Sequence, residues 1–329
     1  MINKKRIKTL GILVCMAVIT GILGGCAADK KETTSKKEIK MAGILMQSDI
    51  EWFKYIQAGM EDAAEKYNVD LVIGNAEMQV LKESDLVDTY AAQGMDAIML
   101  SALDSEASIP ALERANEKGV KIINYNTVVN SDVMKQFVGI DNFQLGAQMG
   151  KYVADYVVSE MGGKAKVAMV TISMFEVGIQ RAEGFLSETK KVPGIEIVAE
   201  QDAADPVEGA SVVETIIQAN DDLDIIWAAN DGGAMGAIVG VNAKNKNSQI
   251  KIFGTDMSLQ AANALLDENN PLFAVSTQQP YEIGYYSVEQ AVKAINGDEF
   301  EAEVIVPLDM YDKKDIKKVN DYLEKFKDL

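Results

Sequence analysis

The chain has 329 residues, of which 48% are hydrophobic and 25% are charged. This length allows two domains with separate cores, and the composition is that of a globular protein. The net charge is −18, and the first 25 residues hold four basic residues and no acid, so the rest of the chain carries −22. Such an acidic body repels phosphate backbones, so we expect no nucleic-acid partner.

The chain has no histidine, and its two cysteines are Cys15 and Cys26. A Ser-His-Asp triad, a Cys-His pair and a His-ligated zinc site are therefore excluded. Both cysteines precede the body of the chain, so no disulfide or thiolate chemistry is expected there. We predict that the protein is not an enzyme and needs neither a metal nor a cofactor.

The N-terminus has the three parts of a secretory signal in their usual order. Met1–Lys8 is basic, Thr9–Leu23 is apolar but shorter than a membrane-spanning helix, and small residues follow. Leu23-Gly24-Gly25-Cys26 resembles the lipobox of bacterial lipoproteins, in which the cysteine is acylated and becomes the first residue. We predict a signal peptide over 1–25 and a lipidated Cys26; the alternative is an ordinary uncleaved anchor. Residues 26–38 are then the lipidated cysteine and a polar, flexible tether.

From Ile39 onward, short apolar runs alternate with amphipathic stretches. In the first series, strands are predicted over 39–46, 69–74, 95–100, 120–125 and 136–140, and helices over 52–67, 85–93, 106–118 and 143–161. In the second series, strands are predicted over 166–172, 195–200, 224–229, 250–254, 273–276 and 304–306. Helices of that series are predicted over 180–190, 206–220, 232–243, 258–267, 283–295 and 312–326. Alternation of this kind indicates α/β lobes, each with a parallel central sheet covered by helices on both faces.

Two pairs of strands echo one another between the two series. Gly94–Ser101 is similar to Leu223–Asn230, and Val120–Asn126 is similar to Ile250–Asp256. Ligands of open parallel sheets bind beyond the carboxyl ends of the strands, so Ser101, Asn126, Asn230 and Asp256 are expected to face a cleft. The alternative for each of them is that it caps the following helix.

Six segments of the body together resemble the sugar-binding family of type I periplasmic binding proteins, the ribose- and galactose-binding group. The segments are Trp52-Phe53, Val138-Gly-Ile-Asp-Asn142, Gln180-Arg-Ala-Glu-Gly-Phe185, Ala229-Asn-Asp-Gly-Gly-Ala-Met-Gly236, Phe253-Gly-Thr-Asp256 and Thr277-Gln-Gln-Pro280.

The resemblance implies two Rossmann-like lobes joined by a three-segment hinge. The predicted N-terminal lobe is 39–141 plus 280–307, and the predicted C-terminal lobe is 142–279 plus 308–329. We place the three crossings near 140–142, 277–280 and 307–309. In this family the ligand lies between the lobes, which close over it.

The resemblance also assigns ligand-binding roles. Trp52 and Phe53 match an aromatic platform for the apolar face of a sugar, although both rings could instead be core. Asp256 matches the carboxylate that accepts hydrogen bonds from hydroxyls, and Arg181 matches the guanidinium that donates to the ligand. The alternative for Arg181 is a surface ion pair with Glu183 or Glu188. The amides of the matching set are Asn126, Asn230 and Gln278.

Four positions depart from the family pattern. Ile50 and Ser101 stand where relatives carry amides, Thr127 replaces a basic residue, and Ala204 replaces an aromatic residue. Phe175 and Tyr281 are the candidates to fill part of the gap left at Ala204. We therefore expect a ligand other than plain ribose or glucose, either bulkier near Ala204 or less hydroxylated near Thr127.

The resemblance implies an extracytoplasmic, membrane-anchored, monomeric solute-binding lipoprotein. It would capture a sugar-like ligand and deliver it to the permease of an ABC importer. The alternative is a receptor subunit that presents the ligand to a membrane sensor or chemoreceptor. The repressors that share this fold carry an N-terminal DNA-binding helix pair, where this chain has an export signal.

Overall fold

The computed structural model describes residues 38–129, 131 and 136–327. The predicted signal peptide, Cys26 and all of the predicted tether except Glu38 lie outside the described residues. Within the part of the chain that is described, no helix combines the length and the apolar character needed to cross a membrane.

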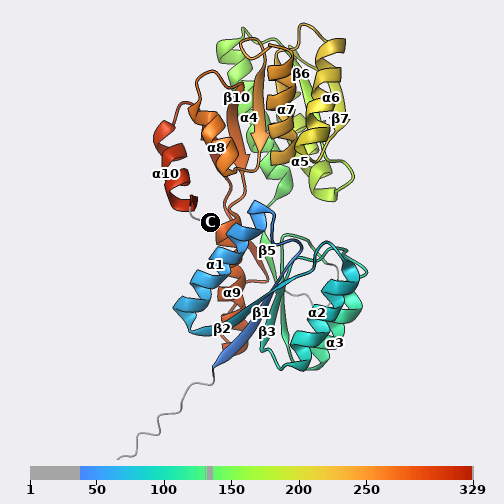
Figure 1. The fold of residues 1–329 in the computed structure, drawn as a ribbon, viewed down its shortest axis with the longest axis vertical. Coiled ribbons are helices and arrows are strands. Elements are labelled where there is room, and N and C mark those ends of the chain that lie inside the picture. The colour runs from blue at the N-terminus through green and yellow to red at the C-terminus, as the bar shows by residue number, and fades with distance from the viewer. Residues whose placement is uncertain (1–37, 130, 132–135, 328–329) are drawn as a thin grey trace, which may run out of the picture. The chain divides into compact units, whose positions relative to one another are not determined.

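Two six-stranded sheets form the centre of the fold (Figure 1). The first has the order β11-β5-β4-β3-β1-β2, and all its strand pairs are parallel. Its strands are β1 (Ile39–Leu45), β2 (Val69–Asn75), β3 (Ala97–Leu100), β4 (Lys121–Tyr125), β5 (Phe137–Gly139) and β11 (Glu303–Ile305). Of the two strands at the middle of the order, β3 is an unbroken apolar run, and β4 is buried in all but its first residue, as expected of strands covered on both faces.

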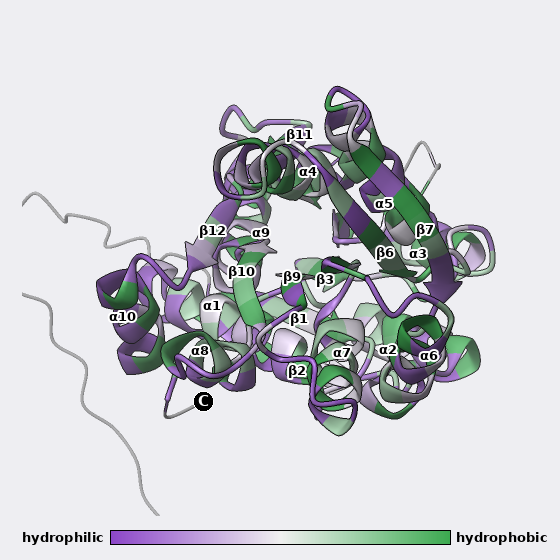
Figure 2. Cartoon of the chain, turned by 90° about the horizontal axis from the view of Figure 1, so that it is seen from above, coloured by the Kyte–Doolittle hydropathy of each residue, from purple (hydrophilic) through white to green (hydrophobic). Residues whose placement is uncertain are grey.

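The second sheet has the order β12-β10-β9-β8-β6-β7. Its strands are β6 (Ala165–Thr171), β7 (Ile195–Asp202), β8 (Ile225–Ala228), β9 (Lys251–Thr255), β10 (Leu272–Thr277) and β12 (Asp309–Asp312). Only β12 runs antiparallel to its neighbour, at the edge of the sheet. Figure 2 shows the hydrophobic colouring of β6, most of which is buried.

Helices cover both faces of each sheet, as the alternating pattern predicts. On the first sheet, α1 (Glu51–Tyr67) and α9 (Pro280–Asn296) pack on one face, and α2 (Val80–Ala92) and α3 (Ile109–Glu117) pack on the other. On the second, α4 (Asn142–Glu160) and α5 (Glu176–Thr189) face α6 (Pro206–Ala219), α7 (Asp231–Ala243), α8 (Leu259–Leu266) and α10 (Ile316–Phe326) across the sheet. The predicted fold class, two α/β lobes with parallel-dominated sheets, is confirmed.

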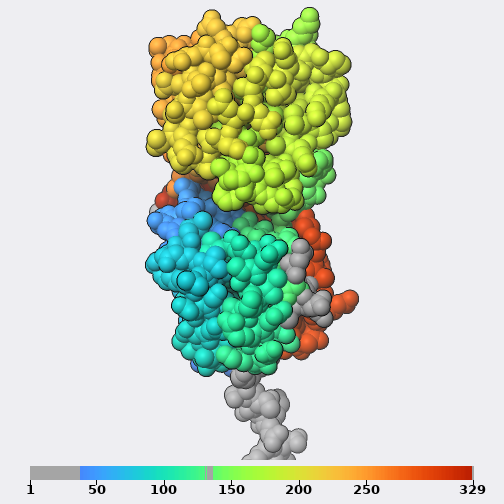
Figure 3. Space-filling model, turned by 90° about the vertical axis from the view of Figure 1, so that its right-hand side faces the viewer, coloured from blue at the N-terminus to red at the C-terminus, as the bar shows by residue number. Residues whose placement is uncertain are grey.

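The chain passes between the two sheets three times in the described residues, after β5, β10 and β11. The late segment that carries α9 and β11 therefore returns to the first sheet, and Figure 3 shows its orange-red atoms beside the blue and green ones. The exact lobe boundaries at 141/142, 279/280 and 307/308 stay a prediction.

Three helix pairs meet at glycines. A Cβ added to Gly146 of α4 would lie 1.9 Å from the carbonyl oxygen of Arg181 in α5, and one added to Gly184 would lie 2.0 Å from the oxygen of Phe143. Gly59 of α1 and Gly284 of α9 show the same reciprocal closeness. Helices α6 and α7 meet less tightly, since a Cβ added to Gly236 would lie 2.7 Å from the Cα of Gly209. At these positions only glycine lets the two backbones touch.

Tyr55 joins the two halves of the fold. It comes from α1, which covers the first sheet, but its side chain is 2% exposed and belongs to the core cluster of the second sheet. Its ring centroid lies 4.6 Å from that of Phe326 in α10. The C-terminal helix is therefore packed against the first helix of the chain.

Several predicted helix starts and one strand differ from the structure. Helix α5 begins at Glu176, four residues before its predicted start, and α3 begins at Ile109, three residues after its predicted start. Helix α2 begins at Val80, five residues before the predicted start at Asp85, and α10 begins at Ile316 because Asp312–Asp315 forms a turn closed by hydrogen bonds to the Asp312 carboxylate. Strand β12 was not predicted, because it is short and holds two aspartates. It is stabilised by pairing with β10 rather than by its own composition.

Candidate functional site

The candidate site is built on two matched corners at the carboxyl ends of β4 and β9. Asn126 and Asp256 follow these strands with φ values of +63° and +68°. Their backbone N–H groups donate to the carbonyls of Val138 and Ser276, at 3.1 and 2.9 Å. Asn and Asp tolerate this left-handed conformation better than other non-glycine residues. The sequence similarity between the two strands therefore extends to the backbone conformation of the residue that follows each of them.

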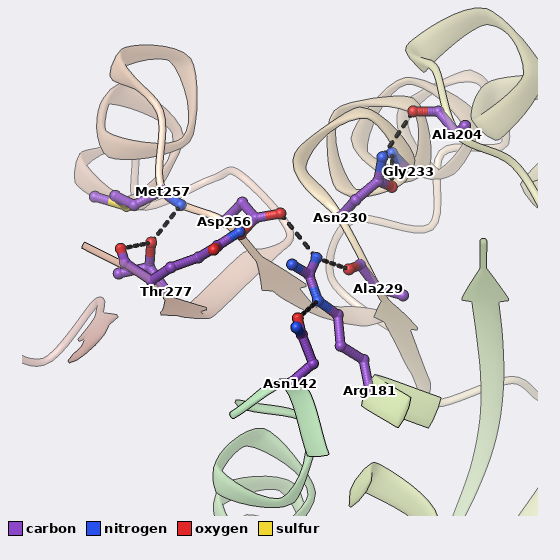
Figure 4. A network of polar contacts seen from close by, with 10 residues as sticks. Asn142, Arg181, Ala204, Ala229, Asn230, Gly233, Asp256, Met257 and Thr277 are labelled. Carbon is purple, nitrogen blue, oxygen red and sulfur yellow. Dashed lines mark hydrogen bonds and ion pairs between the residues drawn. The ribbon is translucent and has the colours of Figure 1, made fainter. Parts of the chain in front are cut away.

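A buried network surrounds Asp256 (Figure 4). The side chain of Arg181 donates from Nη1 to Asp256 Oδ2 at 3.0 Å and to the Ala229 carbonyl at 2.8 Å. Its Nε donates to Asn142 Oδ1 at 2.9 Å. Asp256 Oδ1 accepts a further hydrogen bond from Gln278 Nε2 at 2.9 Å. The structure therefore brings three of the predicted site residues together.

Burial gives this network its strength. Arg181 is 5% exposed, which rules out the alternative of a surface ion pair with Glu183 or Glu188. A charge pair held in a largely dry site attracts more strongly than one in water, and its hydrogen bonds offset the cost of desolvation. Fixed donors and acceptors of this kind can recognise hydroxyl groups without rearranging first.

Asn230 lies beside the network but is already used by the fold. Its Oδ1 accepts from the backbone N–H of Gly233 at 3.0 Å, which caps α7, and its Nδ2 donates to the Ala204 carbonyl at 2.7 Å. The capping alternative is therefore correct for Asn230. Ser101 is not the cap of the following helix, because Ser108 occupies the N-cap position of α3. The buried hydroxyl of Ser101 instead accepts from Asn126 Nδ2 at 3.1 Å.

The two predicted platform rings lie at the start of α1. Phe53 is 7% exposed and belongs to the core of the first sheet, so the core alternative applies to it. Trp52 is half-buried and meets Phe53 edge to face, with 4.9 Å between ring centroids. Its Nε1 is buried and has no hydrogen-bond partner among the described residues. The aromatic platform stays a prediction.

Two acids near the network were not predicted as site residues. The Glu51 carboxylate accepts from the backbone N–H of Leu259 at 2.9 Å and from the Tyr55 hydroxyl. The hydrogen bond from Leu259 joins α1 to the first residue of α8, and so links the two halves of the fold. Asp231 accepts from the Ser258 hydroxyl at 2.9 Å. Its place directly after Asn230, in a segment that carries the family resemblance, was the available signal.

Burial raises the pKa of Asp231 to about 7, and the negative charges of Asp256 and Glu51 add to this although the Ser258 hydrogen bond opposes it. The unfolded chain loses this proton near 3.8, so the folded protein binds more protons between these values. Stability contributed by the protonated group is therefore lost as the pH rises from about 4 to about 7, and the loss is complete above 7.

Asp231→Asn is expected to raise the free energy of unfolding at pH 8 by roughly 1–3 kcal/mol, and to change it little at pH 4. The amide keeps the acceptor for Ser258 and cannot ionise. Urea unfolding at the two pH values measures the difference, with Asp298→Asn as an exposed control. An equal change at both pH values would contradict the assignment.

A pocket of about 560 Å³ adjoins the network. It includes Asn126 and Thr127 after β4, Asn142 at the start of α4, and Glu176, Val177 and Gln180 of α5. Asn126 is one of the predicted ligand residues, and Asn142 is the residue that accepts from Arg181. The pocket therefore opens directly beside the buried polar groups.

Comparisons with known proteins match most of the length of this chain. The family model described as a periplasmic binding protein domain matches residues 42–299. The chain is 32% identical over 316 residues to the ABC transporter periplasmic-binding protein YphF of Escherichia coli (strain K12), covering 94% of each chain. It is 26% identical over 291 residues to the ribose import binding protein RbsB of Bacillus subtilis (strain 168), covering 87% of this chain and 92% of that one.

Among solved structures, the fold is similar to that of a periplasmic solute-binding protein of an ABC transporter from Actinobacillus succinogenes 130z with bound D-allose. The TM-score is 0.79 at 27% sequence identity, and the match covers 85% of this chain and all of that one.

Proposed function

The chain belongs to the periplasmic binding protein domain family, so it is a solute-binding protein and not an enzyme, and we propose that its solute is a sugar or sugar derivative. The protein is proposed to capture this ligand and to deliver it to an ABC importer. The buried Arg181–Asp256–Gln278 network carries this proposal. Relatives named for ribose and a similar structure with D-allose support a polyhydroxylated ligand.

The chemistry of the network suits sugar hydroxyls. A hydroxyl both donates and accepts, so it pairs with a carboxylate on one side and with a guanidinium or amide on the other. Hydrogen bonds to charged groups contribute roughly 1.5–3 kcal/mol each, so a few of them together with stacking on an aromatic ring bring binding to about −8 kcal/mol, the micromolar range, after ordering costs. Asn126 and the ring of Trp52 complete the proposed contact set.

Closure of the two lobes, 39–141 plus 280–307 and 142–279 plus 308–329, is the proposed mechanism. A ligand that touches Asp256 after β9 and Asn126 after β4 gains both sets of contacts only when the lobes approach. The ligand then favours the closed state because its affinity for that state is greater. The protein is proposed to do this as a monomer.

Thermal denaturation of the full chain, purified in detergent, tests the ligand class. D-ribose, D-allose, D-glucose, myo-inositol and nucleosides are each added, with L-leucine as the control. We expect at least one sugar or polyol to raise the Tm by several degrees, since a ligand at 100 times its Kd stabilises the native state by about 2.7 kcal/mol. A shift with leucine and with no polyol would refute the proposal.

Transport is distinguished from sensing by deleting the gene. Loss of uptake of the identified ligand supports delivery to an importer. Intact uptake with loss of a response to the ligand would instead support the receptor subunit.

The N-terminal segment is the basis for the proposed anchor. A signal peptide over 1–25 followed by lipidation of Cys26 would hold the protein at the outer side of the cell membrane, and two or more acyl chains make such an anchor stable. Cys26→Ser is expected to release the protein from the membrane fraction. Unchanged membrane association of this variant would rule out lipidation at Cys26.

A further inference from the structure

The pocket beside Asn126 extends the proposed sugar site in one direction. Its volume of about 560 Å³ lies within the range of pockets that hold a complete small-molecule ligand. Asn142, which accepts from Arg181, connects it to the network, so a ligand held by Asp256 and Arg181 has this space beside it.

The walls of this pocket provide apolar surface. Val128 and Ile305 come from the side of the first sheet and are 57% and 46% exposed, while Val177 comes from α5. Phe137 and Ile140 add further apolar surface. Exposed branched side chains in a concave site gain free energy when a ligand covers them.

Several polar groups at the pocket are already paired within the protein. The Thr127 backbone N–H donates to the Tyr125 carbonyl at 2.7 Å, and the Thr127 carbonyl accepts from the Asn124 amide. The Asn126 amide donates to Ser101. A hydroxyl-rich group that enters here would find the backbone groups of Thr127 already paired.

The charges of the lining exclude another class of substituent. Asp141, Glu176 and Glu303 line the pocket, and no lysine or arginine stands among its lining residues in the described part of the chain. A phosphate or carboxylate on the ligand would be repelled by these carboxylates.

We propose that the ligand carries a neutral, weakly hydroxylated substituent that occupies this pocket, so that the protein prefers a substituted sugar or glycoside to the free sugar. The inference rests on the proposed sugar-binding function. Of the two kinds of ligand expected from the sequence, it favours the one that is less hydroxylated near Thr127 over the one that is bulkier near Ala204.

Calorimetry with the full chain tests this preference. For D-ribose, D-allose and D-glucose, the free sugar is compared with its methyl and propyl glycosides, in both anomers, and with its terminal phosphate ester. We expect at least one propyl glycoside to bind about tenfold more tightly than its parent, from the apolar area that it buries, and every phosphate to bind more weakly than its parent.

A variant pair tests the location. Val128→Asn is expected to reduce the preference for the propyl glycoside at least threefold. Val239→Asn, at a valine of α7 that is 53% exposed and does not line the pocket, is expected to leave the preference unchanged.

Three results would overturn the proposal while the sugar-binding function stands. They are free sugars that bind as tightly as all their glycosides, a phosphate that binds more tightly than its parent, and an unchanged preference in Val128→Asn. Binding of none of these compounds would instead contradict the proposed sugar ligand itself, and the inference with it.

Discussion

Asp256→Ala is expected to weaken ligand binding at least a hundredfold, as measured by calorimetry. The substitution removes the acceptor for the ligand and the partner of both Arg181 and Gln278. Loss of two hydrogen bonds from the ligand to the Asp256 carboxylate accounts for a factor of this size. It also leaves the guanidinium of Arg181, buried at 5% exposure, without its counter-charge.

The left-handed backbone at Asp256 makes the choice of control important. Its φ of +68° is tolerated by aspartate and asparagine but costs roughly 1–2 kcal/mol for alanine, so Asp256→Ala also lowers stability modestly. Asp256→Asn keeps the shape and the backbone preference while removing the charge. It is expected to bind the ligand more weakly than the wild type and to unfold at a Tm closer to that of the wild type. If both variants bound the ligand with wild-type affinity, Asp256 would not be a ligand-binding residue.

Gly146→Ala is expected to lower the free energy of unfolding by roughly 3 kcal/mol or more, as measured by urea denaturation. The new Cβ would meet the carbonyl oxygen of Arg181 at 1.9 Å, and because this atom belongs to a helix backbone it cannot move aside as a side chain could. Helix α4 must then move away from α5.

Val158→Ala on the same helix provides the matched control. Val158 is exposed, and a substitution on the surface usually changes stability by less than about 0.5 kcal/mol. A loss below 1 kcal/mol in Gly146→Ala would show that the two helices can separate at little cost.

Much of the fold could be predicted because the signals are local. Alternating apolar runs identified eleven of the twelve strands in the described residues, and the echo between β4 and β9 located the corners that carry Asn126 and Asp256. Parallel strands place their carboxyl ends at one edge, so polar residues after such strands gather there.

The rest of the site depends on contacts between distant residues. Glu51 looks like an ordinary acid at a helix start, and its bond to Leu259, 208 residues away, has no trace in the sequence around either residue. The roles of Asn230 and Phe53 also required the structure. One is consumed by a helix cap and the other by a core, and residue type alone does not distinguish these uses from ligand binding.

The packing of Tyr55 limits how the chain can be divided. A recombinant piece that contained α1 but lacked α10 would leave the Tyr55 ring in water, and the complementary piece would expose the aromatic surface of Tyr322 and Phe326. Neither lobe is therefore a self-sufficient module. A split-protein reporter cut at the crossing after β5 should regain its folded core only when both fragments are present together.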